Sequence, residues 1–205
     1  MLTRRTLLLS AATVPLAAPA LAQTLSDQDK ADIARVEAYL DGLKSMKARF
    51  TQVAQNGAIS EGTAWLERPG RMRFQYNPPS PFTLIAAHGS LIFNDSSLQQ
   101  TSNISLSRTP LGILLADKVD LNGAVTVTSV QRFPGQLQIT LVRTASPGDG
   151  SLTLIFAEPP MTLRQWTVVD AQRRETHVTL YNAQTGGSFD PILFEQITVP
   201  ASKEG

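Results

Sequence analysis

Apolar and polar residues alternate with a period of two along most of the chain after residue 50. The clearest runs are 71–76 (RMRFQY), 136–141 (QLQITL), 152–156 (LTLIF) and 177–180 (HVTL). Pro-Gly, His-Gly and Gly-Gly pairs, which favour tight turns, separate the runs. Short strands at this spacing indicate an antiparallel meander of about ten or eleven strands that curls into a barrel or a sandwich. No repeat or linker indicates a second domain.

A helical period precedes the strands. Ser26 is expected to cap the helix, and aspartates at 27, 29 and 32 lie where the helix dipole favours negative charge. One face of the predicted helix is apolar because residues recur on it every three or four positions: Ile33, Val36, Leu40, Leu43 and Met46. We expect an amphipathic helix that packs on the sheet.

The segment 105–118 (SLSRTPLGILLADK) interrupts the strand pattern. Thr109 and Pro110 stand at favoured positions for a helix start, and a dense apolar cluster follows them. The prediction is one short helix of about two turns, apolar over most of its circumference. Such a helix must bury its surface, either as a plug that fills the core of the barrel or as a cover over the mouth of a cavity.

The first 22 residues have the pattern of an export signal. Arginines at positions 4 and 5 precede a charge-free stretch, residues 6–21, and Ala20-Leu21-Ala22 supplies the small residues of a cleavage site before Gln23. The stretch is short for a membrane span and contains two prolines, which disfavours a retained anchor. We expect residues 23–205 to leave the cytoplasm as a single domain, by the general secretory route or, because of the paired arginines, by the twin-arginine route.

Composition narrows the possible functions. The chain has no cysteine, so no lipid can be attached at Gln23 and no disulfide can form. Without the leader, 16 basic residues oppose 17 acidic ones, a balance that disfavours nucleic-acid binding. Only two histidines are present, neither is near a nucleophile motif, and no cluster has metal-ligand spacing. The sequence therefore predicts no enzyme, no cofactor and no metal site.

Several stretches, in order along the chain, resemble the LolA family of periplasmic lipoprotein carriers. They are "ARFTQ" at the end of the helix, "SEGTAWLERPGRMRFQYNPP", "HGSLIFND", "TPLGILLAD" and "FDPILFEQITVP". The resemblance implies an incomplete, unclosed antiparallel β-barrel, mainly β with some α, covered by an N-terminal helix and a short helical lid. It also implies a periplasmic carrier whose apolar cavity takes the acyl chains of lipoproteins and ferries them from the inner to the outer membrane. The implied partners are acylated lipoproteins, a lipoprotein-releasing ABC transporter of the inner membrane and a lipoprotein acceptor of the outer membrane; we expect a monomer.

The resemblance also assigns a role to Arg68, which stands before a proline at the end of a predicted strand. Spacing places Arg68 on the same face as Leu66, and by spacing alone it either ends a strand in solvent or points toward the cavity. In the family, the arginine at this position hydrogen-bonds backbone groups of the lid, so Arg68 is expected to act as a lid latch. The expected cavity wall, each member of which fits an ordinary core equally well, comprises Leu66, Phe74, Tyr76, Ile92, Leu111, Ile113 and Leu114. Trp65 falls on the opposite face.

Three other functions fit a chain of this kind. A membrane-anchored lipoprotein acceptor would need an N-terminal cysteine, and a stress-sensing module on the same fold would need a further domain, so the sequence disfavours both. The third function, a periplasmic carrier or sensor of another lipid such as a glycolipid or a fatty acid, is not excluded. An apolar cavity depends on the volume of the chains it binds more than on the identity of the head group.

Overall fold

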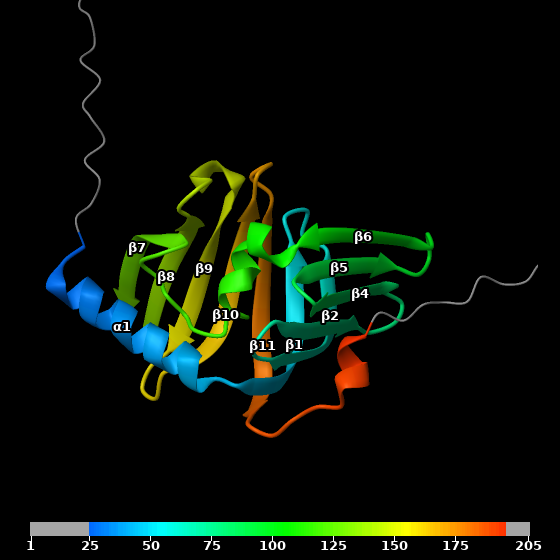
Figure 1. Ribbon diagram of the computed structural model, residues 1–205, viewed down its shortest axis with the longest axis horizontal. Coiled ribbons are helices and arrows are strands. Elements are labelled where there is room, and N and C mark those ends of the chain that lie inside the picture. Colours follow the sequence, from blue (N-terminus) through cyan, green and yellow to red (C-terminus); the bar gives the residue numbers. More distant parts are fainter. Residues whose placement is uncertain (1–24, 196–205) are drawn as a thin grey trace, which may run out of the picture.

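A single curved sheet dominates the computed structural model, which describes residues 25–195 (Figure 1). The expected leader and its cleavage site lie outside these residues. The strands are β1 Ser45–Ala54, β2 Ile59–Glu67, β3 Arg71–Tyr76, β4 Phe82–Ala87, β5 Ser90–Asp95, β6 Gln100–Ser105, β7 Val125–Phe133, β8 Gln136–Arg143, β9 Gly150–Ala157, β10 Thr162–Asp170 and β11 Glu175–Thr185.

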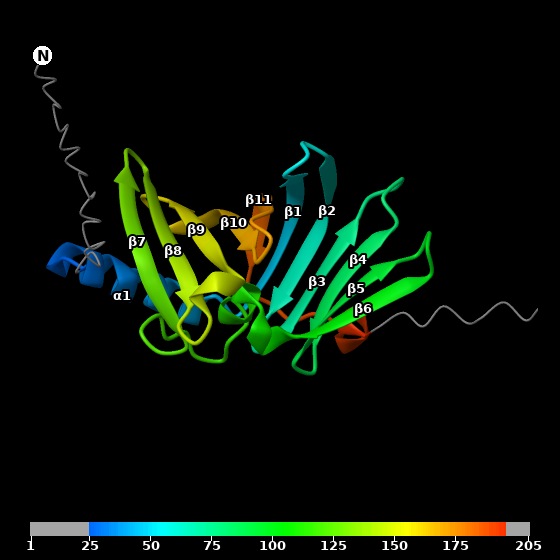
Figure 2. The same ribbon diagram turned by 90° about the horizontal axis from the view of Figure 1, so that it is seen from above.

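The strands follow the order β6-β5-β4-β3-β2-β1-β11-β10-β9-β8-β7, and every neighbouring pair is antiparallel. The first and last strands therefore meet in the middle of the sheet, and β6 and β7 form its two edges. The edges do not pair with each other in the described part of the chain, and the view from above shows the two halves curving around a shared concave side (Figure 2). The expected unclosed barrel of ten or eleven strands is confirmed.

Helix α1, Asp27–Gly42, crosses the concave side over β7–β10 (Figure 1). Ser26 caps it as predicted: its hydroxyl accepts from the backbone N–H of Asp29, and the Asp29 carboxylate accepts from the backbone N–H of Ser26. The helix ends earlier than its apolar period suggested, because Met46 belongs to β1. Met46 still lies in the same core as the helix, since the chain turns directly from α1 into the sheet.

Residues 106–124 connect the two edge strands and run across the concave side, and we call this connection the lid. The expected single helix of two turns is wrong: the lid contains two short 3-10 helices, η1 Leu106–Arg108 and η2 Pro110–Ile113. Thr109 lies between them, and its hydroxyl donates to the carbonyl oxygen of Leu106 and does not cap a helix. A Cβ on Gly112 would lie 2.7 Å from that same carbonyl oxygen, so only glycine allows the two short helices to pack so closely.

One apolar core lies between the concave face of the sheet, α1 and the lid. The alternating runs predicted from the sequence supply its sheet side, since 137, 139 and 141 in β8 and 152, 154 and 156 in β9 are all fully buried. The helix contributes Ile33, Val36 and Leu40, and the lid contributes Leu114 and Leu115. The segment 105–118 thus fills core space and also covers the concave side. It therefore combines features of the plug and of the cover, the two alternatives that its sequence left open.

The convex face is covered at one place by the end of the described chain. Residues 186–195, which we call the strap, include the 3-10 helix η4 Pro191–Phe194 and pack on the outer face of β3 and β4. Phe194 is buried there, and neither Phe194 nor the buried Ile85 of β4 belongs to the main core. Arg73 is buried on the same side, so the charged face predicted for β3 is not open to solvent along its whole length.

Among residues 25–195, no helix has both the length and the apolar character that crossing a membrane would require.

Candidate functional site

Arg68 follows the last residue of β2, and its guanidinium points into the gap between α1 and the lid. Nε donates to the carbonyl oxygen of Ala116 at 2.8 Å, and Nη2 donates to the carbonyl oxygens of Ala116 and Asp117, the latter at 3.3 Å. Nη1 donates to the carbonyl oxygen of Leu40 in the last turn of α1. Only 7% of Arg68 is exposed, so its charge is compensated mainly by backbone carbonyls, which are plentiful at the end of a helix.

The C-terminal half of α1 holds the lid from the helix side. The Asp41 carboxylate accepts from the backbone N–H of Val119 at 2.8 Å and lies 3.4 Å from Arg68 Nη2. Glu37 accepts from the backbone N–H of Leu121 at 2.8 Å. The Val119 N–H lowers the pKa of Asp41 from its ordinary value against the opposing effect of burial, and Arg68 adds to the lowering. Asp41 therefore stays ionised and connects the Arg68 site to the lid backbone.

The turn that carries Arg68 makes a further contact through its backbone. The N–H of Gly70 donates to the carbonyl oxygen of Leu115 at 2.8 Å. Leu115 and Leu114 are themselves buried in the core, whereas Leu111 and Ile113 are partly buried against it. Polar contacts at one end and apolar packing along its length thus hold the lid against the sheet.

Three of the expected wall residues lie together on the concave face. Leu66, Phe74 and Tyr76 are each at most 6% exposed and belong to the main core, and the Tyr76 hydroxyl donates to the Gln52 side chain at 2.8 Å. Burial raises the pKa of Tyr76 to about 12, so the phenol stays neutral. The lid residue Leu114 belongs to the same core and Leu111 and Ile113 pack against it, and η2 contacts β8 and β9.

Ile92 does not join them. It pairs with Ile85, which pairs with Arg73, and Arg73 pairs with Trp65, so all four lie on the convex face. Placing Ile92 in the wall was therefore wrong. Leu91 and Phe93 occupy the concave side of β5 instead. Because residues 91–93 are all apolar, the sequence pattern does not show which of them points to the concave face. Trp65 lies on the opposite face from Leu66, as expected.

The aromatic side of the wall includes two residues that the sequence did not single out. Phe50 of β1 packs on Phe74 and Tyr76, with ring centroids 4.7 and 5.1 Å apart, and Trp166 of β10 meets Phe74 edge-on at 5.9 Å. A bulge between Leu163 and Gln165 shifts the register of β10 against β9. Simple alternation therefore does not reveal that Leu163 and Trp166 share the buried face.

A groove of about 940 Å³ lies along the lid, between the end of β6 and the start of β7. Lid residues line it together with the start of β7 and the end of β8, and they include Leu106, Ile113, Leu115, Val119 and Arg143. Leu66, Phe74 and Tyr76 do not line this groove. The lid residues Leu114 and Leu115 belong to the same buried core as these three residues.

Comparison with known proteins places this geometry in a family. The family model described as "Outer membrane lipoprotein carrier protein LolA" matches residues 41–196. The chain belongs to the LolA family. An outer-membrane lipoprotein carrier protein of Methylococcus capsulatus is 28% identical over 176 residues, which cover 82% of this chain and 83% of the relative. A protein of the same name from Alkalilimnicola ehrlichii is 32% identical over 119 residues, which cover 54% of this chain and 53% of that protein.

Solved structures with a related arrangement have low sequence identity to this LolA-family chain. An uncharacterized conserved protein of Thermus thermophilus has a TM-score of 0.48 at 10% identity, and the match covers 83% of this chain and 94% of that one. A LolA superfamily protein of Nitrosomonas europaea has a TM-score of 0.45 at 8% identity, with 80% and 97% covered.

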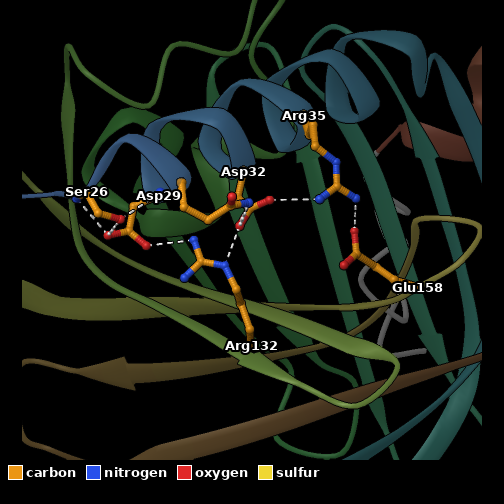
Figure 3. Close-up of polar contacts among 7 residues, drawn as sticks. Ser26, Asp29, Asp32, Arg35, Arg132 and Glu158 are labelled. Atoms are coloured by element: carbon orange, nitrogen blue, oxygen red, sulfur yellow. Dashed lines mark hydrogen bonds and ion pairs between the residues drawn. The ribbon is translucent and has the colours of Figure 1, made fainter.

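The LolA-family match begins at the end of α1 and leaves out most of that helix, which this chain holds by an ion-pair cluster (Figure 3). Arg132 of β7 contacts Asp29 at 2.7 Å and Asp32 at 2.6 Å, and Arg35 contacts Asp32 at 2.7 Å and also pairs with Glu158 in the β9–β10 turn. Hydrogen bonds from Arg132 and Ser26 lower the pKa of Asp29 to about 2. Burial opposes ionisation of Asp32, but Arg132 and Arg35 outweigh it and keep its pKa below the ordinary value. The cluster fastens the start of α1 to the open edge of the sheet.

Proposed function

We propose that this protein is a periplasmic carrier of lipoproteins, with residues 23–205 as one carrier domain released by cleavage after Ala22. Membership of the LolA family over residues 41–196 is the observation that carries the proposal. The name of the Methylococcus relative, which aligns over most of both chains, supports the same role. The acyl chains of the cargo are proposed to occupy the space between the lid and the concave face.

The physical need for such a carrier follows from the hydrophobic effect. Exposing one methylene to water costs about 0.8 kcal/mol, so several long acyl chains would cost on the order of tens of kcal/mol in an aqueous compartment. An apolar wall that includes Leu66, Phe74 and Tyr76 removes most of this cost when the lid moves aside to admit the chains. Cargo would take the place that Leu111, Ile113 and Leu114 hold in the closed arrangement.

Release requires that something oppose cargo binding, and in this proposal the hydrogen bonds of Arg68 do so by favouring the closed lid. The lid closes through hydrogen bonds from Arg68 to Ala116 and Asp117, and these bonds are broken when cargo displaces the lid. Loading therefore costs the energy of the latch, and unloading recovers it, which keeps binding favourable yet reversible. In this scheme, a lipoprotein-releasing ABC transporter of the inner membrane loads the carrier, and an acceptor in the outer membrane unloads it.

A release assay on spheroplasts that display a newly triacylated lipoprotein tests the proposal. Purified residues 23–205 are added, and the soluble fraction is examined for a one-to-one complex with the lipoprotein. We expect lipoprotein in solution only when the carrier is present. If none is released while the protein still binds free fatty acid or glycolipid, the cargo is another lipid, and the carrier of acylated proteins is the wrong assignment.

A further inference from the structure

The base of the β2–β3 hairpin is held from two sides. Glu67 and Arg71 are directly paired residues, and their side chains form an ion pair at 2.9 Å. The turn that follows, residues 68–70, carries the two contacts to the lid, from the Arg68 guanidinium and the Gly70 N–H. The Glu67–Arg71 pair is therefore the last rung of the hairpin before the latch.

The strap holds this rung from the convex side. The backbone N–H of Phe189 donates to the Glu67 carboxylate at 3.4 Å, and the Arg71 guanidinium lies over the Phe194 ring, 5.4 Å from its centroid. Two residues further along β3, on the same face as Arg71, Arg73 donates to the carbonyl oxygen of Leu193 at 3.1 Å. Alternation along the strand turns Glu67 outward toward the strap and Arg68 inward toward the lid.

The chemistry of these contacts makes the strap more than a surface covering. Glu67 is 9% exposed, and a buried carboxylate needs its partners. Burial also lowers the pKa of Arg73, which makes its hydrogen bond to the strap backbone part of the compensation for a buried charge. Phe194 is almost fully buried, whereas Ile192 on the same 3-10 helix is 73% exposed. The strap is thus anchored by Phe194 and the two arginines, and it presents an apolar side chain to solvent.

We propose that the strap positions the latch: its docking on the Glu67–Arg71 rung keeps Arg68 and Gly70 within reach of the lid. Glu67 is then a positioning residue, because it acts on the lid only through the turn that carries Arg68 and Gly70. Lifting the strap from outside the barrel loosens the rung and opens the lid without any contact to the concave face. This inference rests on the proposed function for its biological meaning, since lid opening matters only if the lid controls cargo.

Amide hydrogen exchange of the cargo-free protein tests the coupling. The reporter is the N–H of Val119, which donates to Asp41 and lies in the main core, to which Phe194 of the strap does not belong. The reference is the N–H of Leu163, which donates to the Tyr39 hydroxyl beside α1. We expect Phe194→Ala to speed exchange at Val119 about 2- to 30-fold relative to Leu163, the range typical of coupling between sites. Ile192→Ala, on the exposed side of η4, is the matched control and is expected to change neither amide.

Further variants separate the proposal from simpler explanations. Glu67→Gln keeps the size of the side chain and removes its charge, so it is expected to act in the same direction if Phe194→Ala does not fold. In an Arg68→Leu background, Phe194→Ala is expected to add less at Val119 than it does in the parent protein, because the Arg68 part of the coupling is gone and only the Gly70 contact is left.

Three outcomes would overturn the proposal: faster exchange at Gly70 alone, equal acceleration at Val119 and Leu163, or full additivity with Arg68→Leu. The exchange experiment contains no lipoprotein. A failed release assay would therefore contradict the carrier assignment without affecting the exchange result.

Discussion

Arg68 Nε donates to the carbonyl oxygen of Ala116 over 2.8 Å, across a sequence separation of 48 residues. The same guanidinium reaches Leu40 at the end of α1, so one side chain joins the helix, the hairpin turn and the lid. A hydrogen bond from a charged donor contributes about 1.5–3 kcal/mol. A contact of this size is large enough for the proposed latch.

Arg68→Leu is expected to favour the open lid by about 10- to 100-fold, the equivalent of one charge-assisted hydrogen bond. The variant should keep its fold, since its carbonyl partners gain access to water when the lid lifts, but it should retain acylated cargo longer. Release half-lives from a preloaded carrier measure the effect. Arg164→Leu, at an exposed position in β10, is the control. Equal half-lives for Arg68→Leu and the parent would rule out the latch.

Gly112→Ala is expected to disturb the lid while sparing the sheet. Its Cβ would meet the backbone carbonyl oxygen of Leu106 at 2.7 Å, and a backbone group cannot move away cheaply. We expect η1 and η2 to separate at a cost of about 1–3 kcal/mol, seen as a lower melting temperature and faster amide exchange in the lid. Gly148→Ala, which has nothing within 4 Å of its Cβ, should leave both quantities nearly unchanged.

The alternating runs were sufficient to predict most of the sheet, because in β3, β8 and β9 the apolar residues at every second position are buried. Alternation failed where its period is interrupted. Ile92 stands in a run of three apolar residues, and Trp166 follows a bulge, so neither could be assigned a face from spacing. The lid was mispredicted because Thr109 and Pro110 resemble a helix start, whereas Gly112 and the close packing of Leu106 favour two short 3-10 helices.

The long-range polar contacts of the site also could not be predicted from the sequence. The position of Arg68 before a proline drew attention to it, but its hydrogen bonds to Leu40 and Ala116 depend on how three distant segments fold together. Asp32 looked like one of several aspartates near a helix start. Its pairing with Arg132, 100 residues away, follows only once β7 is known to be the edge strand beneath α1.

The two tryptophans offer a direct test of where cargo lies. Trp166 is buried against Phe74 on the concave face, whereas Trp65 lies on the convex face, 5.8 Å from the Lys47 ammonium group. In a Trp65→Phe variant, the remaining emission is expected to change when a fatty acid or an acylated peptide is added, because the proposed cargo space lies against the concave face that Trp166 shares with Phe74. Trp166→Phe should lose the response. A response that survives in Trp166→Phe and vanishes in Trp65→Phe would place the ligand on the wrong face.

Asp32→Asn is expected to destabilise the protein, because the Asp32 side chain is 2% exposed between two arginines. Removing one member of a fully buried pair costs about 3–5 kcal/mol, but Arg35 and Arg132 are 52% and 40% exposed, so we expect about 2–3 kcal/mol. Asp27→Asn, in the same first turns of α1 but 99% exposed, should cost almost nothing. Urea unfolding at neutral pH compares the three proteins. Equal losses in both variants would contradict a specific role for the cluster.

The same cluster predicts how stability depends on pH. The folded protein lowers the pKa of Asp29 to about 2 and lowers that of Asp32, whereas an unfolded aspartate titrates near 3.9. A carboxyl whose pKa is lower in the folded state contributes stability above its unfolded pKa and loses it as the pH falls through the folded value. The contribution of these two carboxyls to the free energy of unfolding should therefore be constant above about pH 5 and should fall from about pH 4 toward pH 2. Urea midpoints across this range should decline less steeply in Asp32→Asn than in the parent protein, and parallel curves would show that the fastening of α1 does not depend on this carboxylate.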